Sequence, residues 1–196
     1  MMVTSAKRSP VQLAELLDGL VDLSAIGNIL VSGLALDSRG LNKGDLFVAC
    51  QGVGSHGLDY LAQAVKRGAA AVICETGSHW DERRIQGLAR TMSIPMILLP
   101  RLRMSVSEMA GRFYGDPSYR MSITGITGTN GKTSCAHFLA QALGSSCAMV
   151  GTLGVGFPGK LRDTGHTTPD AVTLQVELAD LLEQGAKSVA MEVSSH

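Results

Sequence analysis

Residues Gly125–Ser134 have the types and spacing of a loop that binds the phosphate groups of a nucleotide. Glycines let the backbone curve so that its N–H groups converge on phosphate oxygens. A lysine after the last glycine can reach the β- and γ-phosphates, and the hydroxyl that follows it can bind Mg²⁺. We therefore expect ATP and Mg²⁺ to bind here, with Lys132 also acting in catalysis and Thr133 as a metal ligand. The expected nucleotide-binding residues are Thr127, Gly128, Thr129, Asn130, Gly131, Lys132 and Thr133.

The loop departs by one residue from the general pattern GxxxxGK[ST]. That pattern places its first glycine at the position of Ile126, and the glycine stands at Gly125 instead. An alternative is a glycine-rich turn between a strand and a helix, in which the Gly-Lys-Thr run has no chemical role. We favour phosphate binding because the strand, loop, lysine, hydroxyl and following helix all agree.

The elements around the loop have the order that phosphate binding requires, a strand before it and a helix after it. The helix has an apolar face formed by Cys135, Phe138, Leu139, Ala142 and Leu143. A second helix begins at Thr168-Pro169-Asp170, with Thr168 as the expected cap, and runs to about Glu183. The predicted strands are Ser122–Ile126, Cys147–Val150 and Lys187–Glu192.

The first half of the chain also alternates aliphatic runs with helical patterns. The predicted strands are Ile29–Leu36, Asp45–Cys50, Ala69–Cys74 and Pro95–Leu99, and the predicted helices are Leu58–Arg67 and Ser105–Tyr114. Gly115–Ser118 breaks the second helix, so we place a domain boundary there, between residues 1–117 and 118–196. The alternation predicts an α/β fold with mainly parallel sheets in both parts.

Composition excludes several classes of partner. The 196 residues carry 17 basic and 17 acidic side chains, which argues against a protein that binds nucleic acid or anionic membranes by charge. No apolar run approaches the ~20 residues of a membrane span, and no signal peptide is evident. Cys50, Cys74, Cys135 and Cys147 lie in apolar segments, so we expect buried, reduced thiols in a cytoplasmic protein.

Five segments resemble the muramyl (Mur) ligase family. The run Gly125–Thr133 is similar to the ATP loop that these enzymes share with folylpolyglutamate synthetases. Asp37-Ser38-Arg39 and Gly44–Ala49 resemble the N-terminal uridine-nucleotide-binding domain of the Mur ligases. Thr167-Thr168-Pro169 and Met191–His196 resemble those members that add the third residue of the peptidoglycan stem peptide.

The resemblance implies a chemistry and a substrate. ATP would phosphorylate a carboxylate of UDP-N-acetylmuramoyl-L-alanyl-D-glutamate, and the amine of an incoming amino acid would attack the acyl phosphate. Meso-diaminopimelate is the expected amino acid on frequency alone, with lysine as the alternative. Glu192 would join Thr133 as a ligand of Mg²⁺, unless it is an ordinary acid in solvent. The implied substrate contacts are Leu36, Ser38, Val53, Gly54, Ser55, Thr167, Thr168 and Ser194.

The family also implies domains beyond this chain, which stops directly after a strand-like run. We therefore expect an N-terminal UDP-sugar-binding domain, then the first part of a Rossmann-like ATP-binding domain, in a fragment without turnover of its own. Two alternatives stay open: a folylpolyglutamate synthetase, although that family lacks the Asp37–Ala49 segment, and a fragment that only binds nucleotide or UDP-sugar.

Some residues near these motifs allow more than one interpretation. His56 occupies a position where the family commonly has an acid. Arg39 could bind phosphate or pair with Asp37, and we favour the ion pair. His166 could approach substrate, whereas His79 has no partner visible in the sequence.

Overall fold

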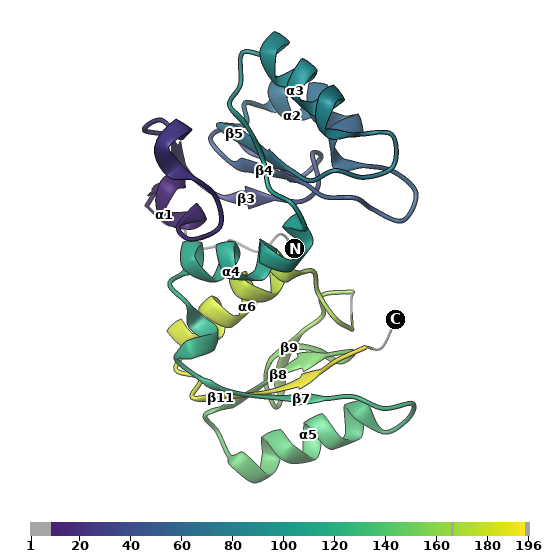
Figure 1. Ribbon diagram of the computed structural model, residues 1–196. Coiled ribbons are helices and arrows are strands. Elements are labelled where there is room, and N and C mark those ends of the chain that lie inside the picture. The colour runs from purple at the N-terminus through teal and green to yellow at the C-terminus, as the bar shows by residue number, and fades with distance from the viewer. Residues whose placement is uncertain (1–8, 166, 195–196) are drawn as a thin grey trace. The chain divides into compact units, whose positions relative to one another are not determined.

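The computed structural model describes residues 9–165 and 167–194, apart from the side chain of Ala25 (Figure 1). These residues form two compact units, which divide between Phe113 and Tyr114. The first unit contains a parallel sheet with helices and the second a mixed sheet with helices, in which three strands run parallel, so the predicted α/β class is confirmed. None of the described helices is long and apolar enough to cross a membrane.

The first unit is built on a four-stranded parallel sheet in the order β3-β4-β5-β6. The strands are β3 (Leu34–Ala35), β4 (Leu46–Ala49), β5 (Ala71–Cys74) and β6 (Met96–Leu98). The helices are α1 (Leu13–Leu17), α2 (Leu61–Arg67), α3 (Glu82–Thr91) and α4 (Leu102–Tyr114), with 3₁₀ turns at Leu23–Ala25 and Gly57–Tyr60. A separate antiparallel pair joins β1 (Val11–Gln12) to β2 (Leu30–Val31).

Both faces of this sheet are covered. Phe47 and Val72 pack with residues of α2 and α3, whereas Val48 and Ile73, next to them along the strands, face the other side and are fully buried. Strands buried on both faces read as continuous apolar runs, as these do. The sheet therefore forms a rigid support for the loops at its edge.

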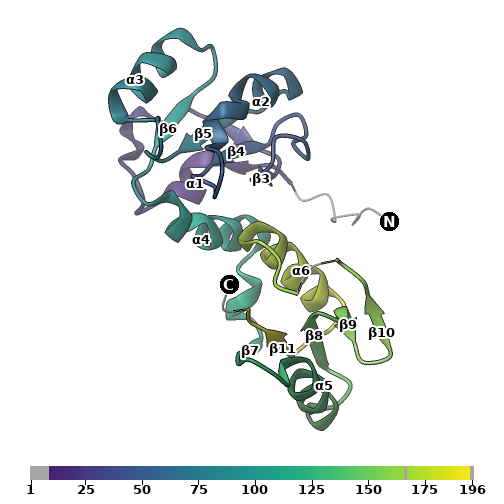
Figure 2. The same ribbon diagram turned by 90° about the vertical axis from the view of Figure 1, so that its right-hand side faces the viewer.

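The second unit carries a five-stranded sheet in the order β10-β9-β8-β11-β7 (Figures 1 and 2). Its strands are β7 (Ser122–Ile126), β8 (Cys147–Gly151), β9 (Gly154–Phe157), β10 (Lys160–Arg162) and β11 (Ser188–Glu192). Strands β7, β11 and β8 run parallel, and β9 and β10 form an antiparallel hairpin beside β8. A 3₁₀ turn at Pro117–Tyr119 precedes β7.

Two helices cover the two faces of this sheet, α5 (Lys132–Leu143) and α6 (Ala171–Glu183). Ala136 and Ala140 of α5 pack on Cys147, Met149 and Ala190. On the other face, Leu178 and Leu181 of α6 pack with Ala148, Val150 and Val189. The β-α-β order places the carboxyl ends of β7, β8 and β11 at one edge of the sheet, where α/β proteins bind ligands.

The structure corrects several local predictions. Ile29–Leu36 is not one strand but two short ones, β2 and β3, in different sheets. The predicted apolar face of α5 is wrong except for Leu139, because Phe138 and Leu143 are 66% and 51% exposed and Ala136 and Ala140 pack on the sheet instead. Asp170, not Thr168, caps α6: its Oδ1 accepts hydrogen bonds from Val172 N and Thr173 N.

The expectation of four buried thiols is also corrected. All four cysteines are free, and Cys74 and Cys147 are buried, but Cys135 is exposed and Cys50 is half-buried. Cys135 precedes the buried Ala136 and lies on the outer side of α5 together with Phe138.

Candidate active site

The phosphate loop connects the end of β7 to the start of α5. Gly131 stands directly before the helix with a φ of 80°, a left-handed conformation that glycine adopts without strain. Lys132 Nζ donates a 2.8 Å hydrogen bond to the carbonyl oxygen of Gly128, which brings the ammonium group over the loop. Residues 127–131 are exposed, so their backbone N–H groups and the positive end of α5 can meet an anion.

Glu192 reaches the loop from the neighbouring strand. Parallel pairing of β11 with β7 sets Glu192 opposite Ile126, the last residue before the loop. The carboxylate is buried, at 1% exposure, and its Oε2 accepts a 2.8 Å hydrogen bond from Thr133 Oγ1. The two residues predicted to hold a metal ion are therefore in contact.

This pair fits Mg²⁺. With bonds of 2.0–2.1 Å in octahedral geometry, adjacent ligand oxygens lie about 2.9 Å apart, close to the separation of Thr133 Oγ1 and Glu192 Oε2. Among the described residues, no group of three or more His, Cys, Asp or Glu side chains could hold a metal. One carboxylate and one hydroxyl suit Mg²⁺, which keeps several waters and takes further oxygens from phosphates.

Gly151 makes room for the carboxylate. A Cβ at this position would lie 2.2 Å from Glu192 Oε1 and 2.7 Å from its carboxyl carbon. Any side chain here would have to displace Glu192. The glycine at the end of β8 is thus a requirement of the site and not only of the turn that follows.

Thr152 is a member of this cluster that the sequence analysis missed. Its backbone N–H donates to Glu192 Oε1 at 2.8 Å, and its Oγ1 is hydrogen-bonded to Glu192 Oε2 at 3.2 Å. The same hydroxyl is hydrogen-bonded to Thr167 Oγ1, also at 3.2 Å. The signal available in the sequence was its place directly after β8, at the edge where β7 and β11 end.

The predicted substrate residues of this unit gather next to the cluster. The backbone N–H of Ser194 donates to Thr168 Oγ1 at 3.1 Å, and the two hydroxyls are also 3.1 Å apart. Thr167 is joined to the cluster through Thr152. These hydroxyls stand just before the N-terminus of the 13-residue helix α6, which favours anionic groups. His166 and His196 lie outside the described residues.

The first unit holds a cavity of about 390 Å³, within the range of small-molecule sites. Leu36, Ser38 and Ser55 line it as expected of substrate contacts. Val53 and Gly54 are not among the lining residues, and the side chain of Val53 is fully exposed. Tyr60 and Gln63, which the sequence analysis did not single out, also line the cavity.

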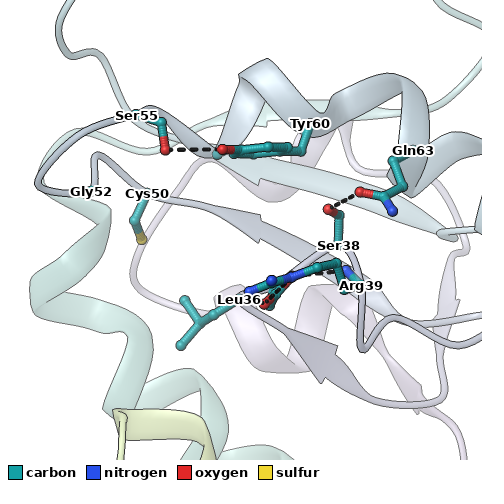
Figure 3. Close-up of a pocket in the computed structure, with 10 residues that line it drawn as sticks. Leu36, Ser38, Arg39, Cys50, Gly52, Ser55, Tyr60 and Gln63 are labelled. Atoms are coloured by element: carbon teal, nitrogen blue, oxygen red, sulfur yellow. Dashed lines mark hydrogen bonds and ion pairs between the residues drawn. The ribbon is translucent and has the colours of Figure 1, made fainter.

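Figure 3 shows how these side chains are arranged. The ring of Tyr60 lies on one side of the cavity and Leu36 on the other, with Ser38 and Gln63 at one end. Ser38 Oγ donates to Gln63 Oε1 at 2.7 Å, and Tyr60 OH donates to Ser55 Oγ at 3.3 Å. An aromatic ring facing an aliphatic side chain, beside a hydroxyl and an amide, can hold a flat heterocycle with a polar edge.

Two further lining residues have perturbed ionisation. Arg39 forms the predicted ion pair with Asp37, at 2.7 Å, and its side-chain hydrogen bonds lower the pKa of the Asp37 carboxyl. Burial raises the pKa of the Cys50 thiol to about 12, so this thiol stays protonated at neutral pH.

His56 holds the loop beside the cavity. It is fully buried; its Nδ1 accepts from Leu58 N at 3.1 Å and its Nε2 lies 3.0 Å from the carbonyl oxygen of Glu75. Asp59 accepts from the backbone N–H of His56, which completes a capping box at the Gly57–Tyr60 turn. An acid, the residue type expected here from the resemblance, could cap this turn in the same way, so His56 is compatible with the local structure.

His79 has a partner in the structure that the sequence did not reveal. His79 Nε2 and Trp80 Nε1 both contact Asp59 Oδ1, at 2.9 Å and 2.8 Å.

Comparisons with known proteins agree on one family. Residues 30–114 match the family described as "Mur ligase family, catalytic domain", and residues 126–196 match "Mur ligase middle domain". Over 187 residues the chain is 46% identical to the UDP-N-acetylmuramoyl-L-alanyl-D-glutamate--2,6-diaminopimelate ligase of Coxiella burnetii (strain RSA 493 / Nine Mile phase I). This alignment covers 94% of the chain and 37% of the relative. The Pseudomonas aeruginosa protein of the same name is 45% identical over 172 residues, which cover 86% of the chain and 34% of that relative.

Solved structures show the same similarity. A UDP-N-acetylmuramoyl-L-alanyl-D-glutamate--2,6-diaminopimelate ligase superimposes with a TM-score of 0.70 at 26% identity, over 96% of the chain and 37% of that protein. The MurF ligase from Thermotoga maritima, solved in complex with ADP, gives a TM-score of 0.51 at 19% identity over 83% of the chain and 32% of its own length. The second match concerns the fold alone. The chain thus spans little more than a third of the proteins it matches.

Proposed function

Because the chain belongs to the Mur ligase family, we propose that it is the nucleotide- and substrate-binding part of an ATP-dependent ligase in peptidoglycan synthesis. The reaction joins 2,6-diaminopimelate to UDP-N-acetylmuramoyl-L-alanyl-D-glutamate, the substrates in the names of its relatives. The observation that carries the proposal is the contact of Thr133 with the buried Glu192 at the end of a glycine-rich loop. We assign UDP-sugar binding to residues 1–117 and ATP binding to residues 118–196.

The phosphoryl-transfer step assigns a role to each residue around the loop. A carboxylate oxygen of the substrate bonds to the γ-phosphorus of ATP, and the bond from that phosphorus to ADP breaks. The loop N–H groups and Lys132 hold the phosphates and balance the charge that moves to ADP. Thr133 and Glu192 would hold Mg²⁺, which would neutralise charge on the β- and γ-phosphates. Thr167, Thr168 and Ser194 orient the substrate beside the γ-phosphate.

The second step forms the amide. The amine of the amino acid attacks the carbonyl carbon of the acyl phosphate, and inorganic phosphate leaves. Turnover is proposed for a protein of the relatives' length, since the chain covers 37% of the Coxiella burnetii protein. For residues 1–196 we propose binding of ATP and of the UDP-muramoyl dipeptide without product formation. We also propose a cytoplasmic location.

The cavity of the first unit takes the uridine end of the substrate. Leu36 and Tyr60 would contact the two faces of the pyrimidine ring, and Ser38 with Gln63 would meet its polar edge. Ser55, together with Val53 and Gly54 of the same loop, would contact the rest of the UDP group.

Isothermal titration calorimetry tests this proposal on the 196-residue chain. We expect Mg-ATP and UDP-N-acetylmuramoyl-L-alanyl-D-glutamate to bind with one site each, and UDP to compete with the latter. Lys132→Met should weaken ATP binding and leave UDP binding unchanged, and Ser38→Ala should do the reverse. A chain that binds folate in preference to the UDP-muramoyl dipeptide would be a folylpolyglutamate synthetase, and the proposal would be wrong.

A further inference from the structure

Thr152 lies between the residues assigned to Mg²⁺ and those assigned to the muramoyl dipeptide. Its Oγ1 is 3.2 Å from Glu192 Oε2 on one side and 3.2 Å from Thr167 Oγ1 on the other. Thr133 Oγ1 contacts the same Glu192 oxygen at 2.8 Å. A continuous row of hydrogen bonds therefore runs from the phosphate loop through Glu192 and Thr152 to Thr167.

The backbone of Thr152 is held in place, whereas the proton of its hydroxyl can rotate about the Cβ–Oγ1 bond. Its N–H donates to Glu192 Oε1 at 2.8 Å, which anchors the residue regardless of what the side chain does. A hydroxyl has one proton, so Thr152 can donate to Glu192 or to Thr167 but not to both at once. A carboxylate without a metal ion is a stronger acceptor than a hydroxyl, so Thr152 Oγ1 donates its hydrogen bond to Glu192.

Binding of Mg-ATP would change which oxygen accepts the hydrogen bond from Thr152. Glu192 Oε2 has two hydroxyl partners, and it is also the oxygen that faces Thr133 at metal-ligand spacing. When Oε2 serves as a ligand of Mg²⁺, its lone pairs are engaged and it becomes a weaker acceptor for Thr152. The Thr152 hydroxyl then donates its hydrogen bond to Thr167 Oγ1. The Thr167 hydroxyl can in turn donate to the substrate.

From this geometry we propose that Thr152 is a positioning residue that couples Mg-ATP binding to binding of the muramoyl dipeptide. The inference rests on the proposed function, because it needs both ligands to bind. Coupling of this kind is reciprocal: each ligand raises the affinity for the other by the same factor. Thr152 touches neither nucleotide nor substrate in this scheme and acts through Glu192 and Thr167.

Calorimetry on three forms of the chain tests the coupling. For each form, the Kd of the UDP-muramoyl dipeptide is measured without nucleotide and with saturating Mg-ATP. In the parent chain we expect about a 5- to 10-fold tighter Kd with Mg-ATP, at the low end of known couplings. Thr152→Val keeps the backbone bond to Glu192 and the side-chain shape, and should reduce this factor to nearly 1 while each ligand still binds alone. Thr152→Ser restores the hydroxyl and should restore the coupling.

A measurement that needs no second ligand guards against a variant with altered stability. In a methyl NMR spectrum, Mg-ATP should shift the Thr167 methyl signal of the parent chain and of Thr152→Ser, but not that of Thr152→Val. Coupling in Thr152→Val as strong as in the parent chain, or a Thr167 signal that Mg-ATP shifts in this variant as far as in the parent chain, would overturn the inference and leave the proposed function intact. A parent chain that binds neither ligand would overturn both.

Discussion

Replacement of His56 should destabilise the first unit by a predictable amount. In the structure this fully buried ring pairs with two backbone groups, Leu58 N at 3.1 Å and the Glu75 carbonyl at 3.0 Å. His56→Ala leaves both groups buried without a partner, and each such loss costs about 1–3 kcal/mol. We therefore expect the free energy of unfolding to fall by about 2–6 kcal/mol. His56→Asn keeps an oxygen that can cap Leu58 and should cost about half as much.

The same ring makes stability depend on pH in a defined direction. Burial lowers the pKa of His56 from its usual 6.5. The hydrogen bond to the Glu75 carbonyl and the nearby carboxylates of Asp59 and Glu75 only partly oppose this effect. Above pH 6.5 the ring is neutral in both the folded and the unfolded chain, so the stability is fully present. As pH falls below that value, His56 becomes protonated in the unfolded chain but stays neutral in the folded chain. The free energy of unfolding should then decrease by at most about 1.4 kcal/mol per pH unit, down to the folded pKa.

Urea unfolding followed by tryptophan fluorescence measures both effects. Trp80 is the single tryptophan of the chain, and its ring centroid lies 6.4 Å from that of His56. The contribution of His56 is the difference between the pH slopes of the parent chain and His56→Asn below pH 6.5. His79→Asn is the matched control, because His79 is exposed and should leave the slope of His56 in place. Equal slopes in the parent chain and His56→Asn would refute the assignment of the titration to His56.

Substitutions at three further positions test the candidate site, with calorimetry as the measurement. Glu192→Gln keeps the shape but removes the charge, so ATP should bind at least about tenfold more weakly in Mg²⁺ and unchanged without it; equal weakening in both conditions would contradict the metal role. Gly151→Ala introduces a Cβ 2.2 Å from Glu192 Oε1 and should likewise abolish the effect of Mg²⁺ on ATP affinity, whereas unchanged affinity would show that Glu192 is not needed there. Tyr60→Ala should weaken UDP binding about tenfold and Tyr60→Phe hardly at all, as expected of ring contact; a large loss in Tyr60→Phe would favour the hydroxyl instead.

The phosphate-loop region was predictable because its local signals do not compete. The strand before the loop, Ser122–Ile126, has the predicted bounds, and α5 follows at Lys132. The contact of Thr133 with Glu192 could be anticipated only as proximity at one sheet edge. Their hydrogen bond depends on the register of β11 against β7, and on Gly151, which no local pattern reveals.

The failures have physical causes too. On α5 either of two stripes of small or apolar residues could face the sheet. The stripe with Ala136 and Ala140 does so, because its smaller side chains let the helix approach the sheet closely. Asp170 caps α6 instead of the predicted Thr168. Either side chain can accept hydrogen bonds from the first N–H groups of a helix, so the capping residue depends on where the backbone enters the helix. Thr152 and Tyr60 carry no motif of their own, and their importance arises from neighbours that are distant in sequence.

The position of β11 between β8 and β7 has a consequence for how the second unit folds. Strand β11, which follows the other described strands in sequence, inserts between two earlier ones, and among the described strands β7 pairs with β11 alone. A ribosome must therefore release residues 188–192 before β7 gains its partner, and the closing contact, Thr133 with Glu192, joins residues 59 positions apart. Such non-local closure is slow and comes late. Pairing of β11 with β7 also brings Glu192 to Thr133, so Mg-ATP should bind only chains in which β11 has paired. It should then protect these chains from proteases that cleave chains in which β11 has not paired.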